Sequence, residues 1–77
     1  MGGSKRYVQP NKERGGWDVV KEGHRRPTAH AETREQAARR ARDLTRQDGG
    51  GEVRIMNRSG KIVSSNTVAR QPPRRGN

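Results

Sequence analysis

The sequence predicts a small α+β domain with the element order ββαββ, in which antiparallel hairpins pack on one helix. Three observations support this prediction. A Gly-Gly-Trp step at residues 15–17 leads into a short alternating segment, a helical apolar pattern starts at Thr33, and a turn ending at Gly60 joins two further extended segments. With 77 residues the chain is long enough for one domain and too short for two.

The expected domain spans residues 5–69, and both ends of the chain are predicted to be flexible tails. Residues 1–4 are rich in glycine, and residues 70–77 combine arginine, proline and glycine in a segment that fits neither a helix nor a sheet. Only 25% of the residues are hydrophobic, with no Phe, one Trp and one Tyr, so the core must be small. A homodimer that buries a further apolar face is therefore an expectation.

The first hairpin is predicted from two short segments on either side of a polar, glycine-containing turn. Residues 5–9 form a strand that Pro10 ends, because proline cannot donate the hydrogen bond that a sheet ladder needs. Residues 17–22 form the second strand, in which Trp17 and Val19 share one face.

A helix is predicted from Thr33 to Asp48, after a segment at residues 28–31 that runs extended. Thr33 and Gln36 have the spacing of a capping box, in which the threonine hydroxyl accepts a hydrogen bond from a free backbone N–H and the glutamine side chain reaches back. Three glycines at residues 49–51 then end the helix. At about 100° per residue, small and apolar side chains share one narrow face that packs on the sheet. These are Ala37, Ala38, Ala41, Leu44 and Thr45.

The second hairpin follows the glycines. Residues 52–56 alternate, so that Val53 and Ile55 point to one side of a half-buried strand. A turn at residues 57–60 places its glycine where a positive φ is easiest, and residues 61–65 return antiparallel.

Four short sequence motifs follow one another along the chain: Gly-Gly-Trp-Asp-Val, Thr-Arg-Glu-Gln-Ala, Gly-Glu-Val-Arg-Ile and Ser-Gly-Lys-Ile. Together they resemble the pattern of a family of short bacterial proteins that is catalogued as a domain of unknown function. The resemblance covers residues 6–66. It implies the ββαββ fold and brings no activity, substrate or site residue. The chain departs from the pattern at Met56 and Asn57, where the family often carries a histidine, and in its richness in arginine.

Composition excludes several classes of protein. The absence of cysteine excludes disulfides, a thiolate nucleophile and a cysteine-based zinc site, and a reducing cytoplasm is the expected location. No stretch approaches the roughly 18 consecutive apolar residues of a membrane span, and the first residues lack the apolar region of a secretory signal. We expect a protein with no membrane partner.

No catalytic, cofactor-binding or metal-binding residue is predicted. A domain this small has little room to enclose an acid–base pair in a cleft, so we expect neither an enzyme nor a small-molecule substrate. His24 and His30 match no metal-ligand spacing and are expected to be exposed loop residues, and Asp18 and Glu22 to be solvated surface carboxylates.

Three features resemble ligand sites and have simpler explanations. Trp17 is expected in the core rather than as a stacking platform for bases, because RNA-reading sheets usually show two or three aromatic residues. The glycines at 49–51 follow a helix, whereas a phosphate-binding loop precedes one. The helix N-terminus at residues 33–35 is the better anion site, although Glu32 and Glu35 weaken it.

The basic residues are the strongest indication of function. Lys and Arg number 18 against 8 Asp and Glu, and the resulting net charge of +10 attracts polyanions, of which nucleic acid is the commonest in a cell. Ion pairs from Glu35 to Arg39 and from Arg39 to Asp43 are expected to account for about half of the helix arginines. A GC-rich genome also enriches arginine.

The leading hypothesis is weak, sequence-nonspecific binding of DNA or RNA. Guanidinium groups bind phosphate through two parallel hydrogen bonds and stay charged at every accessible pH. The predicted phosphate contacts are Arg39, Arg42 and Arg46 of the helix, Arg25 and Arg26 of the preceding turn, and Arg74 and Arg75 of the tail. Composition does not rank DNA against RNA.

The alternative hypothesis is a protein-interaction or homodimerisation module. In that case an exposed strand edge such as residues 61–65 pairs with a partner, and the charge serves only solubility.

Overall fold

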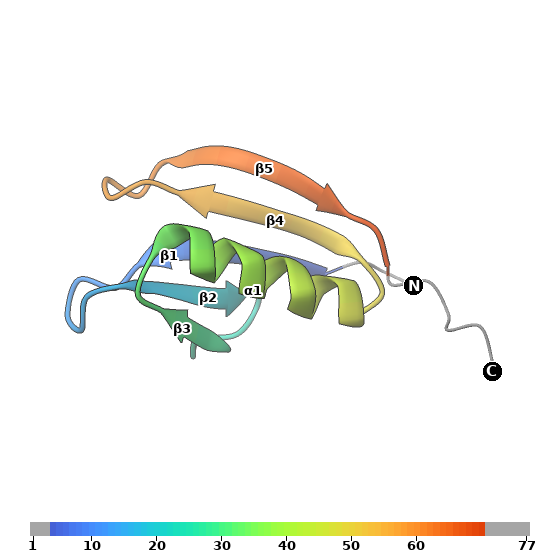
Figure 1. Ribbon diagram of the computed structural model, residues 1–77, viewed down its shortest axis with the longest axis horizontal. Coiled ribbons are helices and arrows are strands. Elements are labelled where there is room, and N and C mark those ends of the chain that lie inside the picture. The colour runs from blue at the N-terminus through green and yellow to red at the C-terminus, as the bar shows by residue number, and fades with distance from the viewer. Residues whose placement is uncertain (1–3, 71–77) are drawn as a thin grey trace.

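The computed structural model describes residues 4–70, so the predicted tails lie outside the described residues except at Ser4 and Arg70. One helix and five strands follow one another along this part of the chain (Figure 1). They are β1 (Ser4–Pro10), β2 (Trp17–Lys21), β3 (Ala29–Ala31), α1 (Arg34–Gln47), β4 (Gly51–Met56) and β5 (Ile62–Val68). The α+β class is confirmed, and the order roughly fits the predicted ββαββ, with one strand added: the extended segment before the helix forms the short strand β3.

The five strands form a single sheet in the order β3-β2-β1-β4-β5, and α1 lies across one of its faces (Figure 1). Both hairpins are antiparallel, as expected, but β1 and β4 pair in parallel, with Val8 opposite Ile55. The prediction of purely antiparallel hairpins was therefore incomplete. Joining the hairpins through β1 and β4 gives one continuous apolar face under the helix, which two separate hairpins would not provide.

Ser4 belongs to β1, which corrects the prediction that residues 1–4 form a flexible tail. Its backbone pairs with Gly51 in the parallel ladder, and its N–H donates to the Gly50 carbonyl oxygen at 3.1 Å. A Cβ atom at Gly51 would overlap the Ser4 backbone, so this close approach requires glycine.

The core lies between the sheet and the helix. Val8, Val19 and Val53 of the three central strands are completely buried against the alanine face of α1, and Trp17 closes one end with 7% of its surface exposed. The predicted helix face is confirmed: Ala37, Ala38, Ala41 and Thr45 are buried and Leu44 is half-buried. Small side chains on that face let the helix axis approach the strands closely.

Both ends of α1 are capped by the predicted residues. The Thr33 hydroxyl accepts a hydrogen bond from the Gln36 N–H at 3.1 Å, although within residues 4–70 the Gln36 side chain does not return the bond. At the other end, the N–H of Gly50 donates to the Thr45 carbonyl and that of Gly49 to the Arg46 carbonyl. This is the Schellman arrangement, and the positive φ of Gly49 makes it possible.

β5 is longer than predicted. It continues past Ser65 to Val68, whose side chain is 7% exposed and belongs to the core. Alternation is weak over Ser64–Thr67 because every residue there is polar, so the sequence offered no apolar signal for the extension.

A buried arginine joins the sheet to the C-terminal end of α1. Arg6 extends from β1 toward the helix, where its guanidinium donates to the Thr45 hydroxyl at 3.2 Å and to the Asp48 carboxylate at 2.6 Å. Lys21 also approaches Asp48, at 3.5 Å. The hydrogen bond from Arg6 lowers the pKa of Asp48 below its ordinary value, and the charges of Arg6 and Lys21 act in the same direction.

On the opposite face of the sheet, Asp18 is buried rather than solvated, which corrects its predicted position. Its carboxylate accepts a hydrogen bond from Asn11 Nδ2 at 3.0 Å and lies 2.7 Å from His30 Nδ1. His30 is exposed, as expected, but it is a strand residue of β3 that pairs with a carboxylate rather than a loop residue. Glu22 and His24 are exposed, as expected.

Candidate nucleic-acid interface

A groove of about 510 Å³ runs between α1 and the β4–β5 hairpin. We call it the arginine groove. The helix supplies three arginines and one carboxylate to its wall, and the floor is apolar. The wall residues are Arg34, Glu35, Arg39 and Arg42, and the floor residues are Ala38, Ile55 and Val63. It exists because β5 lies outside the part of the sheet that α1 covers, so the helix flank and the outer strand leave a step between them.

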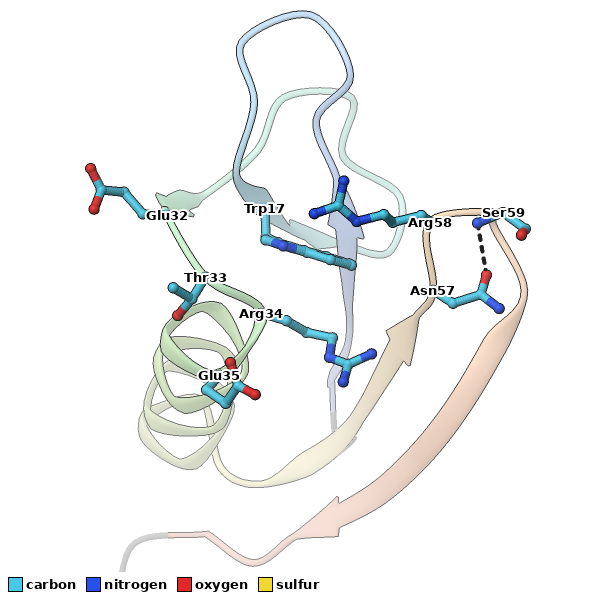
Figure 2. Close-up of a pocket in the computed structure, with 8 residues that line it drawn as sticks. All are labelled: Trp17, Glu32, Thr33, Arg34, Glu35, Asn57, Arg58 and Ser59. Carbon is cyan, nitrogen blue, oxygen red and sulfur yellow. Dashed lines mark hydrogen bonds between the residues drawn. The ribbon is translucent and has the colours of Figure 1, made fainter.

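A second hollow of about 620 Å³ adjoins the groove at the N-terminal end of α1, since Arg34 and Glu35 line both (Figure 2). Figure 2 shows the indole of Trp17 between the side chains of Arg34 and Arg58. The guanidinium carbon of Arg34 lies 5.9 Å from the centroid of the Trp17 ring, within the range of a cation–π contact. Two guanidinium groups thus flank one buried aromatic ring.

The groove arginines lack carboxylate partners within the described residues. The expected pairs of Arg39 with Glu35 and with Asp43 do not form, and Asp43 instead approaches Arg46 at 3.4 Å. That contact joins side chains that are about half exposed, so it adds little stability. The prediction that i,i+4 pairs neutralise many helix arginines was therefore wrong, and α1 presents five arginines against two carboxylates.

The structure places two of the predicted site residues, Arg39 and Arg42, in the arginine groove. At about 100° per residue, Arg39, Arg42 and Arg46 lie on one flank of α1. Arg46, however, is not part of the groove lining and approaches Asp43. Arg25 and Arg26 lie in the turn between β2 and β3, away from this flank, and are exposed. Arg74 and Arg75 lie outside the described residues.

Arg58 is the residue that sequence reasoning missed. It lies in the turn between β4 and β5 and reaches the Trp17 hollow only because β4 pairs in parallel with β1. No local pattern marks it, since a charged residue in a polar turn is ordinary.

Trp17 is confirmed as a core residue. With 7% of its surface exposed, it offers no free ring face for stacking, and Tyr7, the only other aromatic residue, lies on the opposite face of the sheet. The arginine groove, without an exposed aromatic ring beside it, therefore suits contact with backbone phosphates better than stacking on bases.

Residues 4–70 contain no cluster of three metal-binding side chains. Their only helix, α1, falls short of the length and apolarity needed to cross a membrane.

The fold defines the class: this is a small α+β domain in which one helix covers a five-stranded sheet. The chain belongs to the family described as an uncharacterized protein conserved in bacteria (DUF2188), whose model matches residues 6–68. The resemblance seen in the sequence is thereby confirmed. No curated protein and no solved structure matches the chain.

Proposed function

We propose that this protein binds nucleic acid without sequence specificity, with the arginine groove contacting backbone phosphates. The observation that carries the proposal is the flank of α1, where Arg39 and Arg42 line a groove without carboxylate partners among the described residues. Arg34 and Arg58 lie at the N-terminal end of the helix, in a hollow that Glu32 and Glu35 also line. The protein acts as a binding module and not as an enzyme.

The chemistry of the groove favours a polyanion over a small molecule. Guanidinium groups spaced along a helix match a repeating phosphate backbone, and each can bind one phosphate through two hydrogen bonds. The apolar floor of Ile55 and Val63 gives sugar or base edges a surface of low polarity. A cytoplasmic location, consistent with the lack of cysteine, would give the protein access to DNA and RNA.

The rival function is a protein-interaction module, and the exposure of β5 favours it. Ile62 and Val63 are 46% and 54% exposed, the highest values among the large apolar side chains of residues 4–70. This alternative predicts that binding of nucleic acid disappears at physiological salt, because nonspecific attraction between opposite charges is screened there.

Replacing Arg39, Arg42 and Arg46 together by Gln tests the proposal. We expect the slope of log affinity against log salt to fall by about 2 to 3, because about 0.9 counterions are released for each duplex phosphate that is neutralised. Stability should change little, since these side chains lie on the helix surface. Fluorescence anisotropy of labelled random duplex DNA and of single-stranded RNA, over a salt series, measures the slope and ranks the two polymers.

The matched control replaces Lys12, Arg14 and Arg40 by Gln. It removes the same charge from the β1–β2 turn and from the opposite flank of α1. An equal loss of binding in the control would contradict a role for the groove and assign the binding to net charge alone.

A further inference from the structure

β5 contains one extra residue where it borders the arginine groove. Ser64 pairs with Ile55 of β4. Ile62 pairs with the next residue of β4, Met56, so Val63 is left without a partner in the β4–β5 ladder. Such β-bulges are common beside functional sites, where they redirect a side chain. Side chains alternate along a regular strand, so consecutive residues point to opposite faces, yet Val63 and Ser64 both line the groove.

The bulge makes the groove amphipathic. It adds the side chain of Val63, which is 54% exposed, to an apolar floor that also contains Ile55 and Ala38. β5 itself carries no charged residue, so the charged lining of the groove comes from α1 alone, as three arginines and Glu35. A ligand that matches both sides must be anionic along one edge and apolar along the other.

We propose that the arginine groove binds single-stranded nucleic acid in preference to duplex, with phosphates along α1 and sugars and bases against Val63 and Ile55. This inference rests on the proposed function. In a single strand, the bases can leave the stack and turn away from the phosphates, which gives the two unlike edges that the groove requires.

A duplex matches the groove less well. Its bases are stacked inside, and a phosphate backbone borders each of its grooves on both sides. A duplex that contacts the arginines of α1 would therefore leave Val63 and Ile55 without apolar contacts, or would place phosphates against them. Burial of a charge against an apolar surface without a partner is unfavourable.

The apolar side of the groove also agrees with weak binding that does not depend on sequence. Valine and isoleucine side chains have no hydrogen-bond donor or acceptor with which to distinguish one base from another. The stronger stacking contacts of single-strand binders use aromatic rings, and the lining of this groove contains none.

An anisotropy experiment at physiological salt tests the preference. A labelled DNA strand of mixed sequence, about 16 nucleotides long and unable to fold on itself, is titrated alone and after annealing to its complement. Net charge alone favours the duplex, because two strands give it the higher charge density. We expect the opposite order, with the single strand bound about fivefold or more tightly.

Val63→Gln tests the apolar side of the groove. We expect single-strand binding to weaken about fivefold and duplex binding to change by less than about twofold. The slope of log affinity against log salt should not change, since no phosphate contact is lost. In contrast, Arg39→Gln with Arg42→Gln should lower the slope for the single strand by about 1 to 1.5, because about 0.7 counterions are released for each phosphate.

Ile62→Gln is the matched control. Ile62 is also apolar and 46% exposed, but it pairs with Met56 and does not line the groove, so its replacement should leave both affinities unchanged. Val63→Leu keeps an apolar side chain at the bulge and should keep the preference for the single strand. Circular dichroism during thermal unfolding checks that all three variants fold.

The two proposals fail in different ways. Tighter binding of the duplex, or equal losses of single-strand binding from Val63→Gln and Ile62→Gln, would overturn the single-strand preference and leave the proposed function standing. If neither the single strand nor the duplex binds at physiological salt, the proposed function is wrong and the preference is wrong with it.

Discussion

Trp17→Ala is expected to remove a large fraction of the protein's stability at room temperature. Removal of a buried Trp costs about 3–5 kcal/mol, which includes both lost burial and the remaining cavity. The free energy of unfolding of a chain of this length is about 4–11 kcal/mol. The core has few large side chains to compensate, since its completely buried members are three valines, alanines and one threonine. Circular dichroism during thermal and urea unfolding measures the loss.

The control for this variant is Val63→Ala. Val63 is apolar but 54% exposed, so its truncation should change the free energy of unfolding by less than about 1 kcal/mol. Trp17→Phe should retain most of the stability because it preserves much of the buried ring. A Trp17→Ala variant that unfolds at the same urea concentration as the parent protein would contradict the assignment of Trp17 to the core.

Asp48→Asn is expected to cost about 2 kcal/mol at neutral pH. The side chain of Arg6 is only 6% exposed, and the variant leaves its charge in the protein interior without the carboxylate that it contacts at 2.6 Å. A hydrogen bond to a charged group contributes about 1.5–3 kcal/mol. The cost should stay below the roughly 3–5 kcal/mol of a fully buried pair, because Asp48 is 37% exposed and water screens the interaction.

The same variant should change the pH dependence of stability. The pKa of Asp48 is lowered in the folded protein, first by the hydrogen bond from Arg6, so its contribution is complete above the ordinary carboxylate pKa of about 3.9. That contribution is lost as the pH falls through the lowered pKa of the folded state. The stability difference between the parent protein and Asp48→Asn should therefore be full at neutral pH and shrink in strong acid.

Urea unfolding at about pH 7 and at about pH 2.5 tests this dependence. Asp43→Asn serves as the control, because Asp43 contacts Arg46 at 3.4 Å on the helix surface and should contribute less than about 0.5 kcal/mol. An effect of Asp48→Asn as small as that of Asp43→Asn at neutral pH would show that Arg6 does not depend on its carboxylate partner.

Short-range patterns explain which parts of the fold could be predicted. Three features depend only on the backbone geometry of a few neighbouring residues. They are the cap at Thr33, the glycines at 49–51, and the alternation of Val53 with Ile55. Those elements were predicted within a few residues of their observed bounds. The end of β5 was missed because its second half is polar and is a strand only through pairing with β4.

The candidate site was only partly predictable for the same reason. Arg39, Arg42 and Arg46 share a helix flank by periodicity alone, so the sequence identified them. That this flank forms the wall of a groove depends on the position of β5, and the place of Arg58 depends on the parallel pairing of β4 with β1.

The sequence by itself determined the order of the elements, the face of the helix that packs, and the excess of positive charge, because each depends on composition or on residues close together in the chain. Only the tertiary structure decided that β1 and β4 pair in parallel, that Arg6 is buried against Asp48, and that the arginines border an open strand edge. These features depend on contacts between distant residues. These long-range contacts are stabilised by burial of the apolar face of the whole sheet under one helix. That burial involves residues far apart in the chain, so it cannot be predicted from a short stretch of sequence.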